Sequence, residues 1–422
     1  SYLLAGLSFF MNPVVGATLL LNLLMVAVVP LSYLLAHKLT TNKGISLLIA
    51  LFVGFTPVLF DIYNPSPAAL SLPLFLFALL SYMRLEKEGT VPLYLLSIVL
   101  LAFSTPLALL FVLMLCVYHL FQKIEGVQIL PQELELSIFT SFLILWVNLI
   151  FFGTAFREQG IKVIWQNIPV TLLQNFFSDF QLLPLIYAVG ALALILGVYG
   201  AYIVLFEKVH RKSLLLISLA LVTTILLWLK LIPLLVGSIY LSVCLLLLSA
   251  KSLELLAIYL SKTKVSSFKP LFFVFLLLLF AFTSILPLGM ALFTQRAPVA
   301  EGDLEAYLWM GEHLPEDAII AAPLEQGHLV TAISRRKNVA DSGFLYVDDA
   351  QERVTALNKI YTTQFQTELL DKTTQYDIDY IILSLAVQEE QGIYRLPGSD
   401  DSCFPVVYSK GAIIYEVRCG IN

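Results

Sequence analysis

Residues 269–294 read KPLFFVFLLLLFAFTSILPLGMALFT, and residues 301–323 read EGDLEAYLWMGEHLPEDAIIAAP. The first stretch is apolar over a length that can cross a bilayer, because about 20 apolar residues span the hydrocarbon core. The second stretch has the mixed polar and apolar pattern of a water-soluble domain. The chain therefore changes character near residue 294. We predict a transmembrane helical domain over 1–293 and a soluble α/β domain over 294–422.

The overall composition supports a membrane-embedded first domain. Hydrophobic residues make up 59% of the chain and charged residues only 13%, whereas a soluble domain carries about 25% charged residues. Successive apolar runs predict a multi-span α-helical membrane protein with about ten transmembrane helices. We assign the spans to 14–36, 45–60, 68–83, 91–104, 105–121, 137–152, 182–206, 213–229, 231–249 and 270–293.

The placement of Lys and Arg orients these spans. One set of loops holds only Arg157, Lys162 and Lys230. The opposite set holds Lys38, Lys43, Arg84, Lys87, Lys123, Lys208, Arg211, Lys212, Lys251, Lys262, Lys264 and Lys269. Because positive residues concentrate in cytoplasmic loops, the second set is predicted to be cytoplasmic and the 294–422 domain extracytoplasmic. A single helix over 91–121 would separate the basic clusters, so two spans fit this stretch better.

The first residues, Ser1-Tyr2-Leu3-Leu4, show no Met, no basic region and no small-residue cleavage site. They are not typical of a signal peptide. The predicted topology also begins on the outer face. We therefore expect a further span and outer loop upstream; the alternative is an authentic start with a short interfacial helix.

Two ionisable residues on the predicted outer side are candidate functional residues. Asp61 begins the turn DIYNPSP at 61–67, and Lys230 stands between two apolar runs. Ionisable groups at membrane depth are expensive and often functional. The alternatives are a helix-end residue in a Pro-rich turn for Asp61 and a snorkelling side chain for Lys230.

The longest outer loop, 153–181, contains Arg157 and then apolar residues at intervals of three to four. This spacing is typical of helices lying in the membrane interface. The loop is either a mobile flap over a substrate or a structural interfacial hairpin.

Several common site types are missing from the sequence. It contains no Cys-x-x-Cys, His-Glu-x-x-His, Gly-rich phosphate loop or Gly-x-Ser-x-Gly, which are the signatures of several metal, nucleotide and hydrolase sites. The basic trio at 335–337 is too short for a nucleic-acid footprint. We therefore predict no nucleic-acid partner.

The soluble domain shows alternating helical and strand patterns. We expect a helix capped by Asp303 and ended by Pro315, with Tyr307 on its apolar face, and a helix over 347–361 with Tyr361 on its apolar side. A third helix is expected over 326–336. Strands are expected over 317–322, 338–341 and 380–384, and a hairpin over 404–409 and 412–417. This order predicts a largely parallel sheet with an antiparallel edge.

The expected hairpin places two cysteines opposite each other. If it turns near Lys410-Gly411, Cys403 and Cys419 face each other at a Cα separation that suits a disulfide. An extracytoplasmic domain also favours disulfides. A one-residue shift in register would put the side chains on opposite faces and forbid the bond. The alternative is two free thiols.

Three segments of the soluble domain occur in an order with a known counterpart. They read AAPLEQGHL at 321–329, RKNVADSG at 336–343 and YDIDYII at 376–382. This order resembles the outer domain of GT-C-fold membrane glycosyltransferases, in particular the archaeal oligosaccharyltransferase catalytic subunit group. There, a strand leads into a WWDYG-type acceptor motif, a helix and an Arg-Lys…Asp-Gly-type segment. The preceding multi-span bundle matches as well.

The resemblance implies a glycosyltransferase that takes a sugar from a polyprenyl-phosphate carrier and passes it to a protein or glycan acceptor at the outer face of the lipid bilayer. Asp61 corresponds to an outer acidic position of the family, which implies a catalytic role or binding of a divalent metal, Mg or Mn. Lys230, together with Arg157, is the expected donor-phosphate site. Acceptor binding is expected from the motif residues Glu325, Gln326, Gly327 and His328.

The motif also departs from the family pattern, since its position reads PLEQG and has no tryptophan. Recognition of an Asn-x-Ser/Thr sequon is therefore not implied. The alternative function is a non-catalytic membrane scaffold or lipid-glycan-binding protein with the same architecture. An Asp-x-Asp or Glu-x-Asp motif upstream of Ser1 would favour the enzyme.

Overall fold

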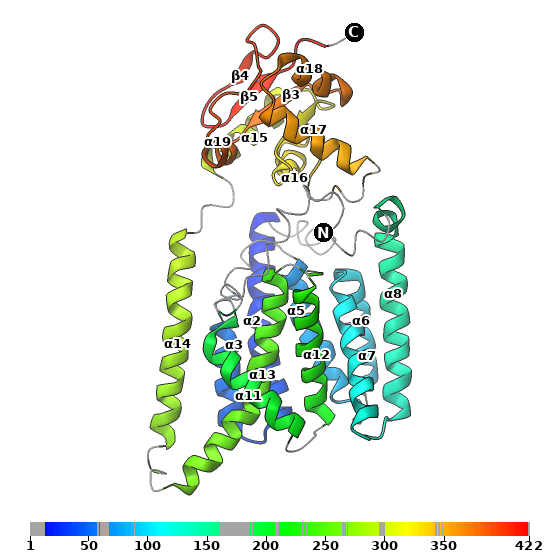
Figure 1. Ribbon diagram of the computed structural model, residues 1–422, viewed down its shortest axis with the longest axis vertical. Helices are drawn as coiled ribbons and strands as arrows, with labels where there is room; N and C mark the ends of the chain where they lie inside the picture. The colour runs from blue at the N-terminus through cyan, green and yellow to red at the C-terminus, as the bar shows by residue number, and fades with distance from the viewer. Residues whose placement is uncertain are drawn as a thin grey trace. The chain divides into compact units, whose positions relative to one another are not determined.

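The computed structural model of the protein describes residues 13–56, 67–87, 89–159, 189–206, 211–229, 234–263, 269–294, 300–341 and 349–420, with a few residues between these ranges (Figure 1). Its contacts divide the chain into two compact units. The described parts of Ser1–Phe151 and Gln174–Phe293 form the first, called here the helical bundle. Those of Phe152–Leu173 and Thr294–Asn422 form the second, called the sheet unit.

The helices of the apolar region follow its hydrophobic runs. They are α2 (Pro13–Leu39), α3 (Lys43–Gly54), α5 (Pro67–Tyr82), α6 (Thr90–Ser104), α7 (Ala108–Ile124), α8 (Pro131–Gln159), α11 (Ala191–Phe206), α12 (Arg211–Trp228), α13 (Leu234–Lys262) and α14 (Lys269–Thr294). Among the described residues, four stretches are long and apolar enough to cross a membrane: Asn22–Leu39, Pro131–Phe151, Arg211–Trp228 and Val236–Lys262. The count of ten spans stays a prediction.

The stretch 91–121 forms two helices rather than one. Helix α6 ends at Ser104, and α7 begins at Ala108. Thr105 between them is extended, with φ −167° and ψ 149°. The residue before a proline avoids the helical region because of a clash with the proline ring. Pro106 therefore explains the end of α6.

Helices α11 and α13 pack closely because α11 presents glycines to its neighbour. A Cβ on Gly200 would lie 2.2 Å from the Leu248 carbonyl oxygen, and one on Gly197 would lie 2.6 Å from the Leu245 carbonyl oxygen. The Ser252 hydroxyl donates to the Leu196 carbonyl at 2.6 Å across the same contact. Small residues and cross-helix hydroxyl bonds are the usual means of joining apolar helices in a membrane.

Aromatic rings join α5, α7 and α13 at Phe75 of α5. Its ring lies 5.0 Å from that of Phe111 in α7 and 5.1 Å from that of Tyr240 in α13, both edge-to-face. The Tyr240 hydroxyl is hydrogen-bonded to Ser71 of α5 at 2.9 Å. A buried tyrosine usually needs such a partner, so this contact fixes α5 against α13.

The sheet unit alternates helices and strands. Its elements are α15 (Glu301–His313), β1 (Ile319–Ala321), α16 (Gly327–Leu329), the π-helical turn η3 (Val330–Ser334), β2 (Lys337–Asn338), α17 (Ala350–Thr362), α18 (Gln366–Gln375), β3 (Tyr380–Leu383), α19 (Leu385–Gln391), β4 (Val406–Tyr408) and β5 (Ile413–Glu416). The strand order is β2-β1-β3-β5-β4. β1 is parallel to β2 and β3, whereas β5 is antiparallel to β3 and β4.

The sheet unit differs from expectation in several places. Asp303 does not cap α15, which begins at Glu301 after Ala300; it is a buried residue inside the first turn. The helix expected over 326–336 is a short α turn followed by a π turn, and the strand expected over 338–341 shifts to Lys337–Asn338. Helix α18 was not predicted, because its sequence is polar and buries only Leu369 and Thr373.

Arg336 stabilises the tight turn of the chain after η3. Its guanidinium donates to the carbonyls of Gly311 and Leu314 at 2.9 Å and 2.7 Å, and to that of Ser334 at 3.1 Å. These carbonyls lie at the ends of α15 and η3, where helices leave acceptors unpaired. The buried cation therefore joins two helix ends in front of β2.

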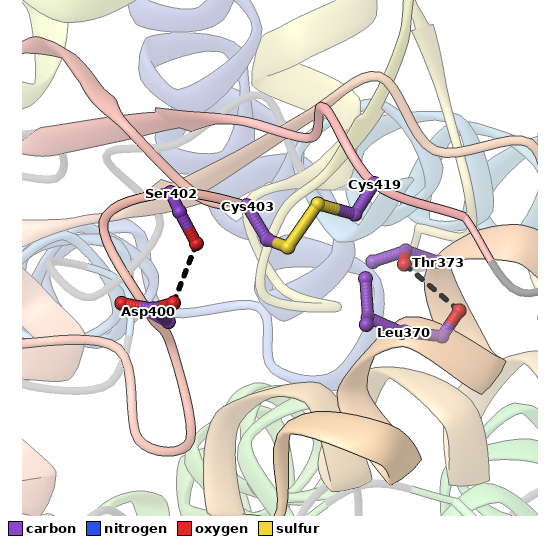
Figure 2. The surroundings of a disulfide bond; sticks show 6 residues. All are labelled: Leu370, Thr373, Asp400, Ser402, Cys403 and Cys419. Carbon is purple, nitrogen blue, oxygen red and sulfur yellow. Dashed lines mark hydrogen bonds between the residues drawn. A yellow bond between two sulfur atoms is a disulfide. The ribbon is translucent and has the colours of Figure 1, made fainter.

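The structure contains the disulfide Cys403–Cys419, with a Cα separation of 5.0 Å (Figure 2). The bridge lies in a hydrophobic cluster that also holds Leu369 and Leu370 of α18. The assumed uniform register is wrong, because a bulge between Val406 and Tyr408 shifts the pairing. The Cys403 carbonyl accepts from the Arg418 N–H at 2.9 Å, so Cys403 lies opposite Arg418.

The expectation that such a shift forbids the bond is therefore also wrong. Both cysteines lie beyond the ends of their strands, β4 beginning at Val406 and β5 ending at Glu416. Strict alternation of side chains is a property of paired extended strands. Outside them the backbone can turn both side chains to one side.

The glycine contact between α11 and α13 generates a first prediction. Gly200→Ala should lower the thermal unfolding midpoint of the detergent-solubilised protein, because its methyl group meets the backbone of α13; such overpacking costs about 1–3 kcal/mol. Gly153→Ala in α8 is the matched control, since its Cβ meets nothing within 4 Å. It should be neutral or stabilising, as alanine is the better helix former. Equal effects of the two substitutions would contradict the proposed packing.

The disulfide generates a second prediction. Its loss in the Cys403→Ser/Cys419→Ser variant should destabilise the sheet unit by about 3 kcal/mol, because the bridge restricts the unfolded chain. Unfolding can be followed by denaturant titration of the full chain. In denatured, unreduced protein, alkylation should label Cys116 and Cys244 but neither of the bridged residues. Cys116→Ser is the control and should leave stability unchanged; labelling of Cys403 would contradict the bridge.

Candidate functional site

The most informative described site is the segment Pro323–His328, called here the 323–328 segment. It follows β1, which lies between its parallel neighbours β2 and β3. The chain leaves β1 toward β2 on one side and later returns to form β3 on the other. In sheets of this kind, ligands bind outside the carboxyl ends of the strands where the connections diverge. The segment occupies that position.

The backbone of the segment turns sharply over Gly327. The N–H groups of Gln326 and Gly327 both donate to the Pro323 carbonyl, at 2.8 Å and 3.0 Å. A Cβ on Gly327 would lie 2.2 Å from the Ala340 carbonyl oxygen. Only glycine allows this approach without displacing the backbone. The Asn338 amide of β2 then binds the Gly327 carbonyl at 2.6 Å.

Buried tyrosines support the segment from two helices. The Tyr307 hydroxyl of α15 donates to the Gln326 side-chain oxygen at 2.9 Å. The Tyr361 hydroxyl of α17 binds the carbonyls of Ala321 and Ile382, at 3.2 Å and 2.9 Å, at the ends of β1 and β3. These bonds hold the start of the segment and the neighbouring strand end in fixed positions.

Asp303 binds the chain that follows β3. Its carboxylate accepts from the Leu385 N–H at 2.8 Å. Burial raises the pKa of this carboxyl, an effect that the N–H groups of Leu385 and Ala386 oppose. Burial, and then the charge of Asp303, raises the pKa of the Tyr307 phenol. Burial also raises the pKa of Tyr361. Both phenols therefore keep their protons at neutral pH and act as donors.

The predicted acceptor residues divide into two pairs. Gln326 and Gly327 face inward and are held by Tyr307 and Asn338. Glu325 and His328 are exposed. The first pair sets the shape of the turn, whereas the second offers a carboxylate and an imidazole to an external ligand.

Of the residues predicted to bind or activate the sugar donor, the structure describes only Arg157. Asp61 and Lys230 lie outside the described residues, and so does the interfacial part of the 153–181 loop from Gly160 onward. Arg157 is exposed in the last turn of α8. Within the described ranges, no group of three or more His, Cys, Asp or Glu side chains is placed to hold a metal ion.

Sequence reasoning missed the supports of the segment. It placed Tyr307 and Tyr361 on apolar helix faces, where they lie, but not their hydroxyl bonds. A tyrosine on an apolar face is a weak signal, because its buried hydroxyl usually needs a partner. Asn338 carried no signal at all, since its bond to Gly327 depends on β2 lying beside β1.

No family model and no curated protein matches this sequence, but solved structures match it. The apo crystal structure of the Archaeoglobus fulgidus oligosaccharyltransferase matches with a TM-score of 0.64 and 13% identity, over 88% of this chain and 59% of that chain. The archaeal oligosaccharyltransferase AglB from A. fulgidus, in complex with an inhibitory peptide and a dolichol-phosphate, matches with a TM-score of 0.65 and 13% identity, over 96% of this chain and 63% of that chain. The oligosaccharyltransferase of the first of these structures, in complex with Zn and sulfate, matches with a TM-score of 0.64 and 13% identity, over 95% of this chain and 61% of that chain.

These matches confirm the resemblance at the level of fold. The chain has the GT-C-like fold of the archaeal oligosaccharyltransferases, and the likeness extends over most of its length. The chain spans 59–63% of the length of these three matched chains.

The burial of Asp303 generates a third prediction. Because its pKa is raised above the ordinary value of 3.8, the protonated carboxyl favours the fold. This contribution is complete below the unfolded pKa and is lost as the pH rises through the folded pKa. Asp303→Asn keeps an oxygen for the Leu385 N–H without the charge. The difference between the unfolding midpoints of Asp303→Asn and wild type should therefore be largest, in favour of the variant, at neutral pH.

That difference should shrink as the pH falls toward the ordinary carboxyl range. Asp317→Asn, at an exposed position, serves as the control and should follow wild type at every pH. A difference between Asp303→Asn and wild type that grows on acidification would contradict the assignment. Thermal unfolding at a series of pH values measures it.

Proposed function

We propose that the protein is a membrane glycosyltransferase of GT-C type that transfers a sugar from a polyprenyl-phosphate carrier to a protein or glycan acceptor. The observation that carries this proposal is the fold likeness to oligosaccharyltransferases over 88–96% of the chain. It includes both the apolar helices and the α/β part. A fold of two such parts suits a lipid-linked donor and a water-soluble acceptor.

The donor side of the reaction is assigned to the outer loops of about ten spans, with the sheet unit on the extracytoplasmic side. Lys230 and Arg157 would bind the carrier phosphate, because cations attract phosphate strongly away from bulk water. One matched structure holds a dolichol-phosphate, which supports a lipid-phosphate ligand for this fold.

Asp61 is proposed to act next to the reacting sugar. A carboxylate there could take the proton of the acceptor nucleophile as a general base. Its oxygens are also of the type that Mg²⁺ and Mn²⁺ prefer, and a bound divalent ion would stabilise negative charge on the departing phosphate. One matched structure contains Zn and sulfate, which supports a metal in this fold.

The acceptor is assigned to the exposed side chains of the 323–328 segment. Glu325 can accept hydrogen bonds from a peptide or sugar, and His328 can donate or accept. Gln326 and Gly327 position them through the bonds to Tyr307 and Asn338. A matched structure carries a tethered acceptor peptide with an NVT sequon, so a peptide is the first acceptor to test.

The alternative is a non-catalytic membrane scaffold or lipid-glycan-binding protein. The sequence observation that favours it is the absence of tryptophan from the PLEQG motif. Such a protein would bind the same lipid-linked glycan without transferring it. Retention of the lipid-linked glycan by the chain in nanodiscs, with no glycopeptide formed in the assay below, would therefore identify it.

The function generates a fourth prediction. The full chain in nanodiscs, given polyprenyl-phosphate-linked glucose, mannose or N-acetylglucosamine and an Asn-x-Thr peptide, should form a glycopeptide detectable by mass spectrometry. Asp61→Asn should lower turnover by about 10²–10⁴-fold, as expected for loss of acid–base catalysis. Glu325→Gln should raise the KM for the peptide by about tenfold or more, because a hydrogen bond to a charged group is lost.

Glu316→Gln is the matched control, because Glu316 is exposed in the same unit but outside the segment. It should leave turnover and KM unchanged. Unchanged activity in Asp61→Asn would remove Asp61 from the chemistry. Equal effects of the two Glu→Gln substitutions would remove the 323–328 segment from acceptor binding.

A further inference from the structure

Four cations meet at one end of the helical bundle, where α2 and α5 end and α12 begins. They are Lys38 in the last turn of α2, Arg84 and Lys87 in the turn after α5, and Lys212 in the first turn of α12. Arg84, Lys87 and Lys212 all act electrostatically on Lys38. Three separate parts of the chain thus bring their charges together. We call these four residues the Lys38 cluster.

No ion pair among the described residues neutralises this charge. The neighbouring carboxylate, Glu133 of α8, is taken by Arg211 at 2.5 Å and by the Tyr118 hydroxyl at 3.4 Å. Lys212 also stands at a helix N-terminus, whose dipole disfavours cations. Against the four cations, these described segments hold one exposed carboxylate, Glu86, so this end of the bundle keeps an excess of positive charge.

Two nitrogen atoms at this end are buried without a hydrogen-bond partner. They are Nε of Arg84 and Nδ1 of His37, the residue that precedes Lys38. An unsatisfied buried polar group destabilises the fold, and such groups are rare in folded proteins. A guanidinium carries several N–H donors in a fork that matches phosphate oxygens. Because this Nε is itself closed to solvent, an external anion would meet the remaining N–H groups of the half-buried Arg84 side chain.

We propose that the Lys38 cluster binds a phosphate group, carried by the headgroup of an anionic phospholipid. Lys38 lies near the end of the apolar stretch Asn22–Leu39, which places the cluster at headgroup depth. Basic pockets between transmembrane helices bind anionic headgroups in this way. The site is separate from the donor-phosphate residues Lys230 and Arg157, which fall in the opposite set of loops, and does not depend on the proposed transfer reaction.

The test uses the full chain in detergent, with phosphatidylglycerol or phosphatidylcholine added, and counts retained lipids by native mass spectrometry. Wild type should retain phosphatidylglycerol in preference to phosphatidylcholine. Because each cation near a membrane surface contributes roughly fivefold in affinity for anionic lipid, Lys38→Gln/Arg84→Gln should bind about 25-fold more weakly. The charge-retaining variant Lys38→Arg/Arg84→Lys should bind as wild type does.

The matched control is Lys123→Gln/Lys262→Gln, which removes the same two charges at exposed positions outside the cluster and should keep the bound lipid. Lys87→Gln, also at an exposed position, should weaken binding about fivefold without risk to the fold. Equal retention of both lipids by wild type, or an equal loss in the control, overturns the proposal. Added inorganic phosphate distinguishes the source: displacement of the lipid at millimolar phosphate shows that free phosphate also occupies the site, and persistence shows a headgroup site.

Discussion

In the core of a bilayer no water reaches the backbone, so every peptide N–H and C=O must find a partner within the chain. The helical bundle meets this constraint with its helices, whose backbone groups bond to one another. Polar side chains within the bundle likewise bond to backbone carbonyls. The hydroxyls of Ser218 and Thr223 in α12 donate to carbonyls one turn earlier, at 2.8 Å and 2.7 Å. With such groups satisfied, the helices can pack through glycines and aromatic rings.

The same constraint makes the few strong charges of the bundle informative. Arg211 and Glu133 pair with each other at 2.5 Å, which removes two charges from a poorly solvated region. The Lys38 cluster has no such partner among the described residues. If it holds a phosphate headgroup, the bundle contacts anionic lipid at the end opposite to the outer loops assigned to the donor. The lipid would then fix α2, α5 and α12 relative to one another while the other end handles substrate.

In the sheet unit, water can satisfy exposed polar groups. There, side-chain hydrogen bonds and a close glycine contact position the candidate site. The 323–328 segment is short and has little secondary structure of its own. Its conformation depends on Tyr307, Asn338 and the close approach of Gly327 to Ala340. Arg336 and Tyr361 bind the ends of the elements on either side. The exposed Glu325 and His328 are therefore carried on a rigid turn, which suits recognition of an acceptor.

Local pattern in the sequence was enough to determine the apolar helices, the strands around Ile320 and Ile381, and the resemblance to GT-C glycosyltransferases, which the fold confirms. The helices and strands depend on hydrophobic spacing within ten to twenty residues, and the resemblance depends on the order of three short motifs, so all of them can be read without tertiary information. The polar helix α18 and the bulge in β4 lack such a signal. The inward turn of Gln326, the supports from Tyr307 and Asn338, and the gathering of Lys38 with Arg84 and Lys212 were decided only by the tertiary structure. Each joins residues far apart in the chain, and their meeting depends on which elements pack side by side.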